Sequence, residues 1–374
     1  MNGFSFPRLR SLMRKEWTQV LRDATTLRMI IALPIMQLFL FGYAVNGNPT
    51  HLPTGLLLAS PSKYERTIVH ALETTGYYDI RLLPSEAEAE RGLAEGRLLF
   101  VINIPPDFDR SVDRGESPSI LIDADATDPN AIGSATAALA ALRTALNHDL
   151  PASVTAASGG TPFQFVIHTR YNPEQITAFN IVPGLICMVL TISTLFITAL
   201  SITRERERGT MENLLAMPVR PIELMIAKIV PYIVIGYLQV IIILVVAVVA
   251  FHVPVRGSIP LLLLALGLFI ASNLSLGVTY SSIAANQMQA QQLAQFTLMP
   301  SFLLSGLFFP FLGMPVWAQW LGNVFPTTHA IRIVRGILLK GNGFADIAPE
   351  LWPMALFTVV VMAAAVWFYR ETLD

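Results

Sequence analysis

Cysteine and charged residues are scarce in this sequence, and both shortages narrow what the protein can be. Among 374 residues there is one cysteine; 14% of residues are charged and 53% are hydrophobic. The single Cys187, inside an apolar run, excludes a disulfide framework and a thiol cluster for metal or redox chemistry. So little charge beside so many apolar residues lies outside the usual range of a soluble domain. The sequence therefore predicts a membrane protein with several spans.

Motifs for nucleotide hydrolysis and metal catalysis are also missing. No Lys follows a Gly anywhere in the chain, which excludes a phosphate-binding loop of the G-x-x-x-x-G-K-[ST] type. The six histidines show no metal-ligand spacing, and no H-E-x-x-H sequence occurs. We therefore expect no catalytic residue, no cofactor, no metal and no nucleic acid partner, so the protein is not predicted to be an enzyme.

Six apolar stretches approach the length of about 20 residues that crosses a hydrocarbon core. They cover residues 27–46, 176–202, 224–252, 258–284, 290–311 and 352–369. Apart from Lys228, their apolar cores carry no charged residue. A proton- or sodium-coupled transporter normally keeps a charged group at membrane depth, so an external energy source fits better.

Short basic segments indicate the orientation. Residues 1–26 combine a basic and an apolar face, which predicts an amphipathic helix at the cytoplasmic interface. Further arginines lie between the second and third stretches, and short basic loops favour the cytoplasm. Six spans then place both termini in the cytoplasm. Arg332, Arg335 and Lys340 fall on the outer side, against the general rule.

Residues 47–175, between the first two spans, have the pattern of a soluble α/β domain on the outer side. Strand candidates at 55–59, 98–104, 119–123 and 164–169 alternate with helix candidates at 62–74, 85–95 and 129–148. This alternation favours a mixed or parallel sheet covered by helices.

The segment Asp123, Asp125, Thr127 within this domain matches the D-x-D-x-T loop of aspartate-nucleophile phosphatases. Aspartates at the end of a strand more often cap the following helix, and no second phosphatase motif is present. Farther along, residues 312–349 are too polar to cross the membrane, and Trp317 and Trp320 suggest short helices at the outer interface.

A charged segment lies between the second and third spans. Gly209 can end the extension of the second span, Thr210 can cap a new helix, and Glu212 complements the helix dipole. A positive-inside loop is the simpler interpretation, but the glutamates go beyond what orientation requires. The residues of interest are Glu205, Glu207, Gly209, Thr210, Met211, Glu212, Leu214, Leu215 and Pro218.

Residues 205–218 resemble the signature of ABC-2 type transport permeases, the membrane subunits of ABC exporters. Residues 325–336 are similar to the family's segment before its last span, and 104–108 and 122–127 resemble the bacterial drug-exporter branch. The resemblance covers essentially the full length. It implies an α-helical polytopic membrane protein with six transmembrane helices and an extracytoplasmic (periplasmic) α/β domain inserted between helices 1 and 2.

The resemblance also implies partners and a role. Residues 209–218 would be the coupling helix that docks on an ATP-binding-cassette ATPase subunit, with Glu205, Glu207 and Glu212 near basic residues of that subunit. The permease would pair with a second copy of itself or a homologous permease in the lipid bilayer of the bacterial inner membrane, and its external domain would contact a periplasmic membrane-fusion adaptor. It would move an amphipathic, drug-like or lipid-like substrate out of the cytoplasm or the inner leaflet.

Polar residues within the spans are candidates for a translocation path. The set is Asn180, Thr194, Thr198, Asn273 and Thr279. Small and hydroxylated residues also let helices approach closely, which is the simpler explanation for most of them. An alternative function is a membrane-anchored receptor or scaffold that does not transport and whose external α/β domain binds a ligand or partner protein.

Overall fold

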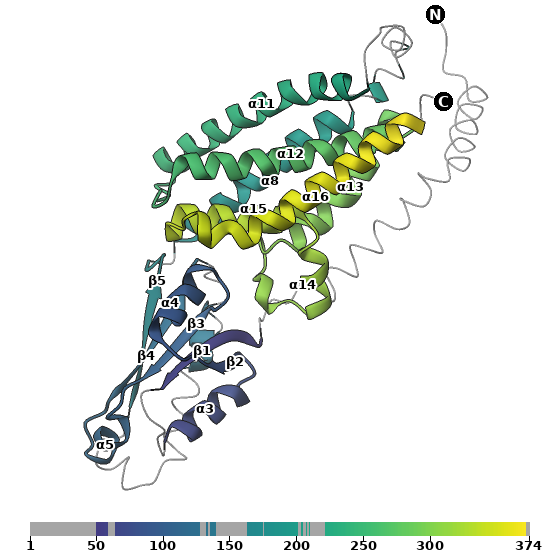
Figure 1. The fold of residues 1–374 in the computed structure, drawn as a ribbon. Helices are drawn as coiled ribbons and strands as arrows, with labels where there is room; N and C mark the ends of the chain where they lie inside the picture. Colours follow the sequence, from purple (N-terminus) through teal and green to yellow (C-terminus); the bar gives the residue numbers. More distant parts are fainter. Residues whose placement is uncertain are drawn as a thin grey trace, which may run out of the picture.

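The computed structural model describes residues 50–58, 64–127, 132–133, 135–139, 163–174, 176–200, 203–204, 207, 209 and 221–371. These residues form a sheet domain and a helical bundle that lie end to end (Figure 1). The predicted amphipathic helix over 1–26 and the first predicted span over 27–46 lie outside the described residues.

The sheet domain, as far as it is described, contains five strands and three bounded helices. Its elements are β1 (Leu52–Leu58), α3 (Glu65–Thr74), β2 (Tyr78–Leu82), α4 (Glu86–Ala94), β3 (Phe100–Ile104), α5 (Phe108–Asp113), β4 (Ser119–Asp125) and β5 (Gln164–Arg170). The strand order is β2-β1-β3-β4-β5. Neighbouring strands are parallel except β3 and β4, which are antiparallel. The expected mixed sheet is confirmed, whereas β2 and α5 were not among the predicted elements.

Helices cover the sheet on two faces because side chains alternate along each strand. On β3, Phe100 and Ile102 join the core that contains Leu72 of α3. Val101, between them in sequence, joins the smaller core that contains Leu93 of α4. Since both faces are apolar, residues 98–102 read as a continuous hydrophobic run up to Asn103, as expected of a central strand buried on both sides.

Residues 171–176 connect the sheet domain to the bundle. Buried Asn172 accepts a hydrogen bond from the Ile176 N–H at 3.0 Å and donates from Nδ2 to the Ile176 carbonyl at 3.1 Å. These two bonds fix the chain between the end of β5 and the start of α8 (Thr177–Ala199). Leu312 of the bundle packs against the sheet-domain core, so an apolar contact supports the same junction.

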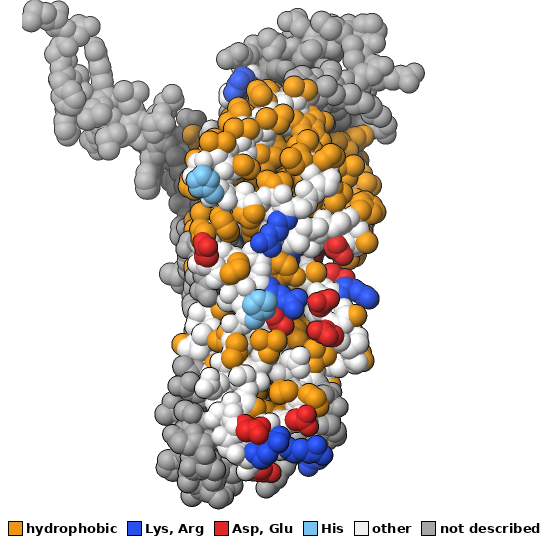
Figure 2. Space-filling view, turned by 90° about the vertical axis from the view of Figure 1, so that its left-hand side faces the viewer, with side chains coloured by type: hydrophobic (Ala, Val, Ile, Leu, Met, Phe, Trp, Pro, Cys, Tyr) orange, Lys and Arg blue, Asp and Glu red, His pale blue; other side chains and the backbone are white. Residues whose placement is uncertain are grey.

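The bundle holds the long apolar helices. After α8 come α11 (Pro221–Val249), α12 (Ile259–Ile283), α13 (Gln287–Leu303), η2 (Phe311–Gly313), α14 (Val316–Gly322), α15 (Pro326–Arg335), the π-helical turn η3 (Gly336–Lys340) and α16 (Phe344–Glu371). In the described part of the chain, α8, α11, α12 and α16 are long and apolar enough to cross a membrane. On the face in Figure 2, apolar side chains cover this half, while charged ones gather over the sheet domain and the junction. The chain is thus a multi-pass membrane protein.

Two predicted spans have different bounds in the structure. The fifth, predicted over 290–311, is a helix only over Gln287–Leu303. Its 17 residues rise about 25 Å, which is shorter than a hydrocarbon core of about 30 Å, so its crossing stays a prediction. The last, predicted over 352–369, begins earlier at Phe344, because Pro349 and Pro353 lie inside the helix without ending it.

The predicted interfacial region 312–349 does contain short helices, but α15 does not rest on a surface. Its residues from Pro326 to Ala330 are buried. The polar members of this stretch are satisfied inside the protein: Thr327 accepts from Ser301 Oγ at 2.7 Å, and Thr328 donates to the Gly322 carbonyl at 2.6 Å. The polar groups of α15 thus find partners within the bundle, and the position of residues 312–349 at the outer interface stays a prediction.

Candidate functional site

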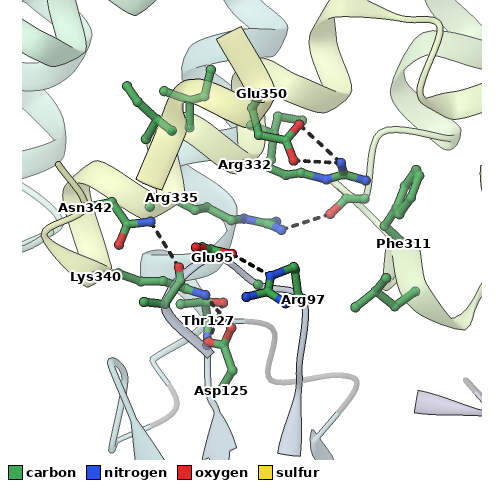
Figure 3. A pocket seen from close by; sticks show the side chains of 18 of the residues that line it. Glu95, Arg97, Asp125, Thr127, Phe311, Arg332, Arg335, Lys340, Asn342 and Glu350 are labelled. Carbon is green, nitrogen blue, oxygen red and sulfur yellow. Dashed lines mark hydrogen bonds and ion pairs between the residues drawn. The ribbon is translucent and has the colours of Figure 1, made fainter. Parts of the chain in front are cut away.

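A cavity of about 330 Å³ lies where the sheet domain meets the bundle. Its lower wall is the loop after α4 and the end of β4, and its upper wall comes from α15, η3 and the start of α16 (Figure 3). Four cationic and four carboxylate side chains face it, interspersed with apolar ones such as Phe311 and Ile331. The lining is therefore partly charged and partly apolar, which suits a ligand that is polar at one end.

A buried ion pair closes one side of the cavity. Lys340 Nζ lies 2.6 Å from Asp125 Oδ2, and the two side chains are 6% and 3% exposed. Lys340 also donates to the Leu93 carbonyl at 2.8 Å, and Asn342 Nδ2 donates to the Ala94 carbonyl at 3.0 Å. These contacts tie η3 and the two residues after it to the C-terminal end of α4 and the end of β4 (Figure 3). We call the contacts of Lys340 and Asn342 with Asp125, Leu93 and Ala94 the junction latch.

The Asp125 carboxylate, which accepts from Lys340 in the junction latch, is also hydrogen-bonded within the sheet domain. Asp125 Oδ1 accepts hydrogen bonds from the N–H of Thr127 at 3.1 Å and from its hydroxyl at 2.8 Å. The Tyr171 ring lies 5.1 Å from Lys340 Nζ, within cation–π range. Burial and the neighbouring Asp125 carboxylate raise the pKa of Tyr171, so the ring stays a neutral phenol near pH 7. The Asp125 carboxylate is therefore engaged on both oxygens.

Asp123, the other aspartate of the D-x-D-x-T match, is also engaged. Its Oδ1 lies 2.9 Å from Arg170 Nε and 2.8 Å from His168 Nδ1. Burial opposes the charge of Arg170, but the hydrogen bonds and charge of Asp123 outweigh it and raise the guanidinium pKa. Asp123 pairs with Arg170 of β5, and Asp125 pairs with Lys340 of the bundle. Both aspartates of the motif therefore hold parts of the structure together.

The upper wall of the cavity carries a second charged cluster. Arg332 Nη1 donates to Glu350 Oε1 at 3.0 Å, and its guanidinium lies 4.3 Å from the centre of the Phe311 ring. His329, buried beside it, places Nδ1 2.5 Å from Glu350 Oε2 and Nε2 2.9 Å from the Asn323 carbonyl. The cluster joins α15 to the first turns of α16.

These contacts explain the cations that conflict with the general orientation rule. Arg332 is paired with Glu350 and Lys340 with Asp125. Arg335 donates to the carbonyls of Gly306 at 3.1 Å and Asn180 at 3.4 Å. All three cations are thus held by partners within the protein. The sequence did not reveal this, because every partner lies on another element of the fold.

Two residues of the predicted coupling segment fall among the described ones. Gly209 has a φ of +69°, the left-handed backbone common just after a helix end. Glu207 is exposed, and its Oε1 accepts a hydrogen bond from the N–H of Gln287 at 2.7 Å; its Oε2 accepts from Gln287 Nε2. The hydrogen bonds from Gln287 lower the pKa of Glu207. The remaining members lie outside the described residues: Glu205, Thr210, Met211, Glu212, Leu214, Leu215 and Pro218.

The five path candidates are all buried and belong to α8 or α12. Thr194 donates to the Leu190 carbonyl at 2.5 Å, Asn273 to the Phe269 carbonyl at 3.0 Å and Thr279 to the Ser275 carbonyl at 2.9 Å. Thr198 donates to the Thr194 carbonyl, again within its own helix. Asn180 is 4% exposed, and its Oδ1 has no hydrogen-bond partner among the described residues.

Close helix packing accounts for some of these residues. A Cβ added to Gly277 of α12 would lie 2.4 Å from Thr198 Oγ1 and 2.9 Å from the Leu195 carbonyl. Small residues on both helices are what permits such an approach. None of the five candidates lines the cavity at the junction. Their assignment to a translocation path stays a prediction.

The fold and these sites agree with the comparison to known proteins. The family model described as "ABC-2 family transporter protein" matches residues 24–367. The chain belongs to the ABC-2 transporter family. The match covers the sheet domain and the bundle together, so the whole arrangement is a family property rather than a fusion of unrelated parts.

Relatives of this ABC-2 protein include membrane permeases. "Probable multidrug ABC transporter permease YbhS" of Escherichia coli (strain K12) is 29% identical over 344 residues, covering 90% of each chain. "Probable multidrug ABC transporter permease YbhR" of the same organism is 28% identical over 368 residues, covering 98% of this chain and 99% of the relative. "ABC transporter G family member 20" of Dictyostelium discoideum is 24% identical over 366 residues, covering 94% of this chain and 50% of that protein. The chain is thus a transport permease by family.

Proposed function

We propose that this protein is the membrane-spanning subunit of an ATP-driven ABC exporter. It moves an amphipathic substrate, drug-like or lipid-like, out of the cytoplasm or the inner leaflet of a bacterial inner membrane. Separate ATP-binding-cassette subunits hydrolyse the ATP, and two permease subunits form the transporter. Both termini lie in the cytoplasm, and the sheet domain lies in the periplasm, where an adaptor protein has access to it.

One observation carries the proposal: a single helix, α8, lies between the sheet domain and the predicted coupling segment. The N-terminus of α8 follows the sheet domain directly, and residues 203–209 of the coupling segment follow its C-terminus (Figure 1). With 23 residues, α8 is about 35 Å long, enough to cross a hydrocarbon core. A force applied to the coupling segment is therefore transmitted by a rigid element to the opposite end of the bundle.

Coupling to a separate ATPase subunit is tested by purifying the protein together with an ATP-binding-cassette subunit encoded by a neighbouring gene. Glu212→Ala and Leu215→Ala, both in the predicted coupling helix 209–218, should lose assembly or substrate-stimulated ATPase activity. Glu116→Ala, an exposed position of the sheet domain, is the matched control and should keep both. Normal assembly and normal ATPase coupling in both coupling-helix variants would count against the proposal.

The orientation is tested with single cysteines in spheroplasts. The only native thiol, Cys187, is buried, so background labelling by a membrane-impermeant maleimide should be low. Glu73→Cys in the sheet domain should label in intact cells. Glu207→Cys should label only after permeabilisation. The reverse pattern would contradict the periplasmic placement of the sheet domain.

A further inference from the structure

The helix α14 presents two different faces beside the junction cavity. Gln319 and Asn323, four residues apart and hence on one stripe, line the cavity. Val316 and Trp320 of α14, together with Val324 two residues after its end, form an adjacent apolar surface and are 69%, 76% and 58% exposed. We call these three residues the α14 apolar stripe. A polar cavity and an exposed apolar stripe thus share one short helix.

The lower wall of the cavity supplies a guanidinium with spare donors. Arg97 uses Nε for Glu95, at 2.5 Å, and its side chain is 56% exposed. Among the described residues, no hydrogen bond engages its Nη1 or Nη2. Two parallel N–H groups in a fixed fork match the oxygens of a phosphate, which is why arginine suits such groups. Arg97 can therefore receive an anionic headgroup without losing Glu95.

The junction latch holds this loop in place. Lys340 and Asn342 bind the carbonyls of Leu93 and Ala94, just before the turn that carries Arg97. Within the turn, Gly96 has a φ of +74°, and a Cβ there would lie 3.7 Å from Lys340 Nζ. The main chain before Arg97 is thus pinned to the bundle, so the guanidinium is positioned at the cavity before any ligand arrives.

The upper wall is equally ordered. Arg332 is held by Glu350, by Asn323 Oδ1 at 3.2 Å and by the Phe311 ring. A headgroup in the cavity would lie between this fixed cation and Arg97 (Figure 3). Pre-organised donors lower the entropic penalty of binding, since few side chains need to be ordered by the ligand.

We propose that this junction cavity binds the phosphate headgroup of an amphiphile of the phospholipid class, with its apolar chain on the α14 apolar stripe. Tryptophan is typical of the level at which headgroups meet hydrocarbon, which suits Trp320 beside a headgroup site. The proposal rests on the proposed export function only for its biological meaning, because binding itself needs neither ATP nor an ATPase subunit. It deepens that function by giving the substrate class an anionic headgroup.

The test is equilibrium binding to the full chain, purified alone in an uncharged detergent and measured by native mass spectrometry. The probes are lysophosphatidylglycerol, a monoacylglycerol with the same chain, and inorganic phosphate. We expect the lysophospholipid to bind more tightly than either of the others. Equal binding of inorganic phosphate would overturn the proposal in favour of a free-anion site, and equal binding of the monoacylglycerol would overturn the role of the headgroup.

Matched variants separate the headgroup from the chain. Arg97→Gln should weaken lysophosphatidylglycerol binding about tenfold, while Arg81→Gln should leave it unchanged. Arg81 is a close control because it too pairs with a carboxylate two residues earlier, Asp79, at 3.0 Å. Equal affinities of these two variants would overturn the assignment of Arg97.

For the chain, Trp320→Ala should weaken binding of both the lysophospholipid and the monoacylglycerol. Trp367→Ala, at an exposed tryptophan near the far end of α16, should weaken neither.

If Arg97→Gln does not fold, Arg97→Lys replaces it as the headgroup variant. It keeps the charge, loses the two parallel N–H groups of the guanidinium, and should still bind more weakly than the natural protein. Failure of ATPase coupling with intact lipid binding would overturn only the export function.

Discussion

Lys340 of the bundle and Asp125 of the sheet domain form an ion pair that is almost closed to solvent, with 2.6 Å between Nζ and Oδ2. Removing one partner of such a pair leaves an uncompensated buried charge, which typically destabilises by about 3–5 kcal/mol. Lys340→Met should therefore lower the free energy of unfolding by an amount of this order. Thermal or denaturant unfolding in detergent measures it.

Two further variants make this prediction specific. Lys340→Met combined with Asp125→Asn removes both charges but keeps an oxygen for the Thr127 donors, so the double variant should be more stable than Lys340→Met alone. Arg81→Met breaks an ion pair that is 72% and 44% exposed, so the change should stay below about 1 kcal/mol. A Lys340→Met loss no larger than that of Arg81→Met would contradict the role of the junction latch.

Gly277→Ala should loosen the contact between α8 and α12. The new Cβ would lie 2.9 Å from the Leu195 carbonyl, and backbone cannot rotate away as a side chain can. Overpacking of this kind typically destabilises by about 1–3 kcal/mol, again measured by unfolding. Gly343→Ala is the control, since its Cβ would meet only Asp346 Oδ2 at 3.7 Å, an ordinary contact. Equal stability of the two variants would show that the helices separate easily.

The sequence predicted the long helices well because length and apolar content determine them. The stretches predicted over 176–202, 224–252 and 258–284 correspond to α8, α11 and α12 within a few residues. The sheet was also predictable, since residues 98–102, which lead into β3, form an uninterrupted apolar run. β2 was not among the predictions, although Asp79 and Arg81 alternate with apolar residues in the period-two pattern of a half-buried strand that pairs with β1.

The site at the junction was not predictable, for a physical reason. Its buried ion pair joins Lys340 and Asp125, which are more than two hundred positions apart, and no local pattern records such pairing. The sequence showed only that three cations fall on the outer side, against the orientation rule: Arg332, Arg335 and Lys340. That conflict was the one usable hint that these cations have partners inside the fold.

His329→Gln should destabilise the contact between α15 and α16. Each ring nitrogen faces an acceptor oxygen, Nε2 the Asn323 carbonyl and Nδ1 the Glu350 carboxylate. Glutamine cannot satisfy both partners in this geometry, and an unsatisfied buried acceptor typically destabilises by about 1–3 kcal/mol. His70→Gln, at an exposed position of α3, is the control and should stay within about 0.5 kcal/mol in the same unfolding experiment.

Glu207 should tie the coupling segment to the start of α13 in a pH-dependent way. Because hydrogen bonds from Gln287 lower its pKa below the ordinary value of 4.5, the contact contributes fully above pH 4.5 and is lost as the pH falls through the lowered pKa. Glu207→Gln should therefore raise hydrogen exchange at the Gln287 amide at neutral pH. Glu73→Gln, an exposed glutamate of α3, should leave that amide unchanged.

The same measurement distinguishes a charge effect from a loss of packing. When exchange rates are corrected for the intrinsic effect of pH, the natural protein should approach the Glu207→Gln variant as the solution is acidified, while the variant itself should show no such transition. A transition of equal size in both proteins would mean that another group titrates there. Because Glu207 precedes the predicted coupling helix by only two residues, loosening this contact should also reduce stimulated ATPase activity more than Glu73→Gln does.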